Sequence, residues 1–220
     1  MQVAGYTKAF SMDQGRVLGN DQLFQALYSA PLTDSKREGI CTGLSMIWLA
    51  RRMMFHSESA EQRFAALATG AAFKWGGKTQ DIHLASGTGS GSMYDMLQQM
   101  YGDALQAYAL RIVASSCDAT FDGTPSVLGQ AGADASKGKG TYCLWNIGLA
   151  TPSGSAGHMV ATYASHGTLG LNRHLYFFDP NMGEYRIGVG DAVDFFTKMF
   201  EAYQGTFGGL NYLATFEVDR

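Results

Sequence analysis

The stretch GICTGLSMIWL, residues 39–49, decides how this chain is expected to fold. It follows a short charged segment and opens an apolar run. Its side chains at helical spacings of three and four positions are Leu44, Ile47, Trp48 and Arg51. This spacing predicts a helix that starts at Cys41, runs to about Phe55 and buries one apolar face.

Cys41 stands at the start of this helix and not in its middle. A thiol at a helix N-terminus lies near the positive end of the helix dipole, which favours the thiolate. Gly39 and Gly43 are small neighbours, so we expect a substrate backbone to approach the sulfur and the Cys41 N–H to donate to a developing oxyanion. Taken alone, a cysteine in an apolar helix is more often a small buried hydrophobe.

His158 is the candidate for a catalytic base among five histidines. It follows Gly157 and begins an apolar strand, whose edge would hold the imidazole rigidly. The others lie in polar or loop surroundings and are expected at the surface: His56, His83, His166 and His174. No spacing typical of metal ligands occurs, so we expect no zinc site and no cofactor. Cys117 and Cys143 are expected to be structural.

Asp179 closes the aromatic strand that precedes Pro180. The sequence Asp-Pro-Asn strongly favours a turn, so a turn with no catalytic role is one interpretation. The other is a carboxylate that orients His158 and stabilises its imidazolium form. Glu184 is a weaker candidate for the same role.

The order Cys, His, Asp is that of papain-like enzymes, and three stretches carry a more specific resemblance. GICTGLSMIWL resembles the nucleophile motif of the YopT/AvrPphB family of cysteine proteases. GHMVA, residues 157–161, is similar to its histidine motif, and FFDPNMGEYRI, residues 177–187, to its aspartate motif. Together the motifs span residues 39–187, most of the chain.

The resemblance implies a papain-like fold in residues 36–220, a Cys41–His158–Asp179 triad, and hydrolysis of a peptide bond in a protein substrate through an acyl-enzyme. Members of the family are bacterial effectors that act in host cells, some on signalling or membrane-anchored proteins. It therefore implies secretion without a cleavable signal and action in a reducing cytosol. Residues 1–35 are expected to be loosely packed or self-processed, as in some relatives.

The segment before the nucleophile departs from papain-like enzymes, which place a Gln or Asn there as an oxyanion donor. This chain has Ser35, Lys36 and Arg37 at those positions, so Ser35 or another group supplies the second donor. Three alternatives stay open: an amidase acting on side-chain amides, as in deamidase or transglutaminase toxins; a peptidoglycan endopeptidase, although Ile40 replaces the usual aspartate; and a binding domain without activity.

Composition narrows the class of protein. The chain has 220 residues, 46 % hydrophobic and 16 % charged, which suits one globular domain with a substantial core. A net charge of −3 argues against a nucleic-acid surface, and three cysteines argue against a disulfide framework. The longest apolar run, residues 40–50, is too short to cross a bilayer, and the first residues lack the pattern of a secretory signal.

The remaining pattern predicts an α+β chain with helices first and a mostly antiparallel sheet second. Further helices are expected at residues 21–30, from Ser57 or Ser59 through Phe73 with Gly76 and Gly77 ending it, at 92–102 and at 191–203. Strands are expected at residues 110–113, 142–147, 158–163, 174–178 and 212–217. Glycine-rich loops are expected at residues 76–92 and 117–140.

Overall fold

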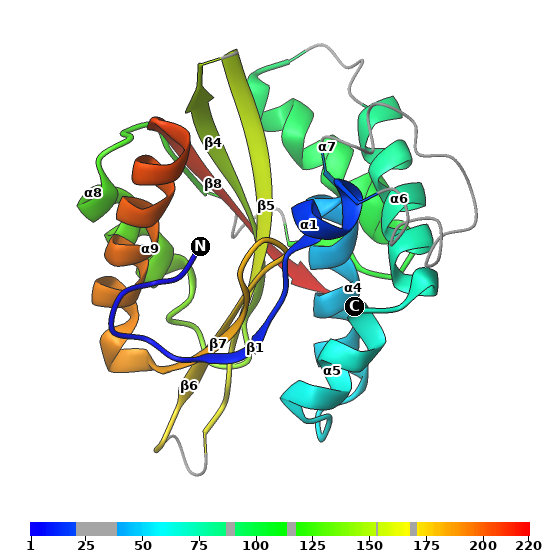
Figure 1. Cartoon of the computed structure of the whole chain (residues 1–220), viewed down its shortest axis with the longest axis horizontal. Coiled ribbons are helices and arrows are strands. Elements are labelled where there is room, and N and C mark those ends of the chain that lie inside the picture. The colour runs from blue at the N-terminus through cyan, green and yellow to red at the C-terminus, as the bar shows by residue number, and fades with distance from the viewer. Residues whose placement is uncertain (21–38, 87–90, 114–117, 153, 168–170) are drawn as a thin grey trace.

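The computed structural model describes residues 1–20, 39–86, 91–113, 118–152, 154–167 and 171–220. Within these ranges the chain forms three layers (Figure 1). A central antiparallel sheet has helices α4–α7 on one face and α8 and α9 on the other. This arrangement confirms the predicted α+β class and the antiparallel pairing.

The element bounds are as follows. The helices are α1 (Gln14–Leu18), α4 (Cys41–Met54), α5 (Ala60–Leu67), α6 (Gly70–Ala85), α7 (Met93–Gln106), α8 (Pro125–Ala135), α9 (Ala192–Phe207) and the 3-10 helix η2 (Val189–Asp191). The strands are β1 (Lys8–Ser11), β2 (Arg111–Ile112), β3 (Asp118–Thr120), β4 (Tyr142–Thr151), β5 (Gly154–Ala164), β6 (His174–Asp179), β7 (Gly183–Gly188) and β8 (Gly209–Asp219).

The sheet has the order β1-β7-β6-β5-β4-β8-β2, and β3 also pairs with β8. Strand β5 pairs with β4 along almost its whole length, from Gly154 to Tyr163. On its other side β5 pairs with β6 only from Ala161 to Ala164. Among the described residues, the first part of β5 therefore has one free edge, and His158 lies on it.

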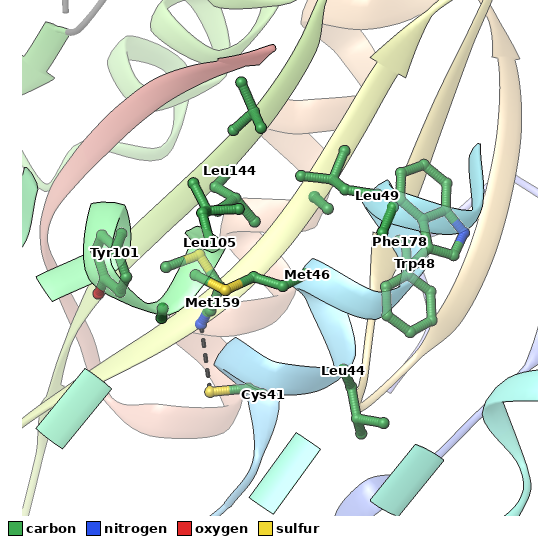
Figure 2. Close-up of a cluster of buried hydrophobic side chains, with 14 of the residues drawn as sticks. Cys41, Leu44, Met46, Trp48, Leu49, Tyr101, Leu105, Leu144, Met159 and Phe178 are labelled. Atoms are coloured by element: carbon green, nitrogen blue, oxygen red, sulfur yellow. Dashed lines mark hydrogen bonds between the residues drawn. The ribbon is translucent and has the colours of Figure 1, made fainter. Parts of the chain in front are cut away.

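Both faces of the sheet are buried, which explains why its strands are apolar nearly throughout. On β4, Leu144 packs toward α4, whereas its neighbour Trp145 packs toward α8 and α9. Figure 2 shows the α4 side, where Trp48 stacks on Phe178 of β6 with ring centroids 5.6 Å apart. The core on each face fixes α4 and α9 against the strands that lie between them.

Helix α4 is buried on almost every side, so the predicted single buried face is only partly right. Leu44 and Trp48 are buried as expected, but Ile47 and Arg51 lie on the half-exposed side. The physical reason is that α4 lies between the sheet and α6. A Cβ built on Gly43 would lie 2.2 Å from the carbonyl oxygen of Gly76. Gly43 thus permits close helix packing, and not substrate approach as predicted.

Several predicted boundaries are wrong. The predicted third helix is two helices, because Thr69 caps a new helix, and Gly76 and Gly77 lie inside α6 and do not end it. Residues 76–85 are therefore helical and not loop. The loop predicted at 117–140 contains β3 and α8, which starts at Pro125 in the favoured first helical position. The helix predicted at 21–30 lies outside the described residues.

The described part of the N-terminal segment packs on the sheet. Strand β1 pairs with β7, and Lys8 lies opposite Tyr185. Val3 is fully buried, and its N–H donates to the Tyr185 hydroxyl at 3.1 Å. The division into a segment of residues 1–35 and a catalytic domain stays a prediction. None of the helices in the described ranges is long and apolar enough to cross a membrane.

Candidate active site

Cys41 is the first residue of α4, and its side chain is 8 % exposed. The residue before it, Ile40, makes no side-chain hydrogen bond that caps the helix. The sulfur instead accepts from the Met159 N–H at 3.5 Å, as Figure 2 shows, and from the Thr42 N–H. The helix start is thus arranged to stabilise negative charge on sulfur.

His158 lies on β5 directly before Met159, so the strand brings the imidazole to the sulfur. Its Nε2 lies 3.0 Å from Asp179 Oδ1, and its side chain also hydrogen-bonds Cys41. Because Nε2 is used by Asp179, Nδ1 is the ring nitrogen that remains for the thiol. The ring is 5 % exposed and packs near Tyr203 of α9.

Asp179 ends β6 and is fully buried. Its Oδ1 also accepts from the Asn181 N–H at 2.6 Å. The same carboxylate therefore both stabilises the turn and contacts His158, so the two interpretations of Asp179 do not exclude each other. Its Oδ2 accepts from the Tyr203 hydroxyl. Sequence reasoning missed Tyr203, because an aromatic residue in the amphipathic helix α9 looks like any other core residue.

The charges at the site are coupled. Burial alone would raise the pKa of the Cys41 thiol, but the hydrogen bond and charge of His158, with the Met159 and Thr42 N–H groups, lower it below its ordinary value. Burial lowers the pKa of His158, but the nearby Asp179 and Cys41 outweigh burial and raise that pKa to about 10. Each group therefore favours the charged form of the other, thiolate on Cys41 and imidazolium on His158.

Glu184, the weaker candidate to orient His158, is used elsewhere. Its carboxylate accepts from Arg63 Nε at 2.7 Å and from Trp48 Nε1 at 2.7 Å. All three side chains are buried, so this ion pair stabilises the packing of α4 and α5 on β7. Ser35, the candidate oxyanion donor, lies outside the described residues, as does Cys117.

The remaining candidates separate into two groups. Cys143 is buried, and its thiol donates to the Ala135 carbonyl oxygen at 3.5 Å, as expected for a structural residue; His56 and His166 are exposed as expected. His83, however, is buried, and its ring stacks on Tyr101 with centroids 4.6 Å apart, so its predicted surface position is wrong. Helix α6 extends past its glycines and carries His83 against α7. The described residues include no group of three or more side chains suited to hold a metal ion.

Comparison with known proteins identifies the family. Residues 5–216 match the family described as Yersinia/Haemophilus virulence surface antigen (Peptidase_C58). The chain belongs to this family. The fold of this peptidase is similar to the crystal structure of Pseudomonas avirulence protein AvrPphB, with a TM-score of 0.66 and 20 % identity over 88 % of this chain and 98 % of that one. No curated protein matches.

These findings confirm the resemblance predicted from the three motifs. The chain is a cysteine peptidase of a bacterial effector family, and its fold is papain-like.

Proposed function

We propose that this peptidase cleaves peptide bonds in another protein, with Cys41 as nucleophile, His158 as acid and base, and Asp179 as the group that orients His158. One observation carries the proposal. A thiol at an uncapped helix N-terminus hydrogen-bonds an imidazole whose other nitrogen lies 3.0 Å from a fully buried carboxylate. This is the geometry of an activated nucleophile with an oriented base.

The proposed reaction has two stages. The Cys41 thiolate attacks the carbonyl carbon, and the Cys41 N–H donates to the oxyanion that forms, an interaction worth about 2.7–4 kcal/mol per donor. The His158 imidazolium protonates the leaving amine, and a thioester remains on Cys41. Neutral His158 then removes a proton from water, which hydrolyses the thioester and restores the thiolate.

The free edge of β5 supports an extended peptide as substrate. Residues 154–157 are exposed, and among the described residues no strand pairs with them on the side away from β4. They lead directly to His158 and to the Met159 N–H that contacts the sulfur. A peptide added along this edge as a further strand would therefore present its backbone carbonyl to Cys41.

The family supports a substrate in a host cell. The description of the Peptidase_C58 family is Yersinia/Haemophilus virulence surface antigen, and AvrPphB is named an avirulence protein. Cys41 is a free thiol, and a free nucleophilic thiol persists in a reducing cytosol. We therefore infer action on a host protein, such as a signalling or membrane-anchored one, in the cytosol of the host cell.

The test is labelling with an epoxide inhibitor of thiol proteases, followed by peptide mapping, in the natural chain and in His158→Ala. Labelling confined to Cys41 and lost without His158 is expected, and Cys143 is the internal control. The natural chain is then incubated with a host-cell extract. New peptide termini that are absent with Cys41→Ala support the protease. A gain of 1 Da in a target protein without chain cleavage would contradict the protease proposal and indicate a side-chain amidase.

A further inference from the structure

Gln14, in the N-terminal segment, joins the two loops that hold the candidate site. It is the first residue of α1 and is 4 % exposed. Its backbone N–H donates to the carbonyl oxygen of Pro180, the residue after Asp179, at 2.9 Å. Its side-chain Oε1 accepts from the N–H of Ile40, the residue before Cys41, at 3.0 Å.

These contacts fix the orientation of the side-chain amide. Because Oε1 accepts the Ile40 N–H, the other end of the amide, Nε2, is left as a donor. No acceptor for it is found in the part of the chain that the structure describes. The amide lies against Gly39, where an added Cβ would be 3.7 Å from Nε2. Gln14 therefore brings an amide donor to Gly39, in the loop that enters α4, two residues before the nucleophile.

The role of such a donor follows from the chemistry of the neighbouring thiol. Acyl transfer to Cys41 places negative charge on the carbonyl oxygen, close to the Cys41 N–H. One donor is weak support for a tetrahedral oxyanion, and donors held rigidly in a buried site act most strongly because they need no reorganisation. Gln14 is rigid, since both its backbone and its side chain are hydrogen-bonded.

We propose that Gln14 Nε2 is the second donor of the oxyanion hole, so that the substrate oxygen lies between this amide and the Cys41 N–H. The proposal rests on the acyl-transfer chemistry proposed above. It assigns the donor to a residue far upstream of Cys41, and not to the segment directly before it. It also makes the first 20 residues part of the active site.

Two reagents separate an oxyanion donor from a residue that only positions Cys41. Iodoacetamide alkylates the thiolate: a sulfur–carbon bond forms, iodide leaves, and no oxyanion develops. p-Nitrophenyl acetate acylates it: a thioester forms, p-nitrophenolate leaves, and a tetrahedral oxyanion develops on the way. Both reactions are followed on the full chain, by mass at Cys41 and by absorbance.

The variants are Gln14→Met, which is neutral and of similar size, and Gln14→Glu, which keeps an acceptor for the Ile40 N–H but has no donor. Gln62→Met is the matched control, because Gln62 Oε1 also accepts a backbone N–H, that of Ser59 at 2.8 Å, in the capping box of α5. We expect acylation of both Gln14 variants to fall by about 10²- to 10³-fold, with alkylation of Gln14→Met unchanged. Gln62→Met is expected to keep both rates.

The other outcomes overturn the inference. Acylation at the natural rate in Gln14→Met means that Gln14 is no oxyanion donor. Acylation and alkylation that fall by the same factor in both variants mean that Gln14 only positions the Cys41 loop. Failure of the protease proposal is seen separately: the natural chain would react with both reagents yet cleave no protein in the host-cell extract.

Discussion

The contact between Gly43 of α4 and Gly76 of α6 predicts that two facing glycines respond oppositely to the same substitution. In Gly43→Ala the new Cβ would lie 2.2 Å from the Gly76 carbonyl oxygen and 2.3 Å from its Cα. Ordinary contact begins near 3.4 Å, so α4 and α6 must separate by about an ångström. In Gly76→Ala the new Cβ would lie 3.5 Å from Ile40 Cδ1, which is ordinary contact.

The magnitudes follow from these distances. Overpacking against a backbone that cannot rotate away costs about 3 kcal/mol, the upper end of the usual range. Replacing a helical glycine by alanine raises the unfolding free energy by about 0.5–1 kcal/mol at either site. Gly43→Ala should therefore lose about 2 kcal/mol of unfolding free energy, and Gly76→Ala should gain up to about 1 kcal/mol. For a chain of this size, the corresponding change in Tm is about 2–4 °C per kcal/mol.

The assay is urea unfolding followed by tryptophan fluorescence, together with the rate at which iodoacetamide alkylates Cys41. Gly43→Ala should also slow alkylation, because it shifts the start of α4 from the position in which Cys41 meets His158, whereas Gly76→Ala should not. Equal stabilities for the two variants, or an alkylation rate that Gly43→Ala leaves unchanged, would refute the argument from helix contact.

The remaining predictions concern charges and hydrogen bonds. The pKa of His158 is raised to about 10, so kcat/KM should fall on the alkaline side near that pH as the imidazolium is lost. Asp179→Asn removes the charge that raises this pKa. In a pH profile of this variant, the fall in kcat/KM should therefore move toward the ordinary histidine pKa of 6.5. Tyr203→Phe removes a donor to the Asp179 carboxylate and should lower kcat with little change in KM, and it should cost about 1.5–3 kcal/mol of unfolding free energy; an unchanged kcat would contradict this. Burial lowers the pKa of His83 to about 4, so the unfolded chain takes up this proton first, and stability should fall by about 3 kcal/mol between pH 6.5 and 4. His83→Phe keeps the stacking on Tyr101 and should remove that loss in urea titrations at both pH values.

The sequence predicts the elements whose signal is local. Cys41 at the start of an apolar helix, the strand after Gly157 and the Asp-Pro-Asn turn each have a pattern that can be read without the fold. The structure brings their side chains into hydrogen-bond contact.

The rest depends on contacts between distant residues. Gly76 looks like a helix end until Gly43 of another helix is seen against it. His83 looks exposed because its burial depends on α6 continuing past that glycine. Gln14 and Tyr203 carry no pattern of their own, since each matters only through residues more than 20 positions away. Local propensity cannot report such contacts.

The pairing of β1 with β7 has a consequence for how this peptidase becomes active. Lys8 pairs with Tyr185, so the strand that leads to Gln14 cannot join the sheet until the chain beyond residue 185 is available. Contacts of such long sequence separation form slowly and late in folding, because a large loop must close before they form. If Gln14 acts as proposed, the site is completed only when the N-terminal strand β1 has paired with β7. A partly folded chain would then have the Cys41 thiol but would lack the second oxyanion donor.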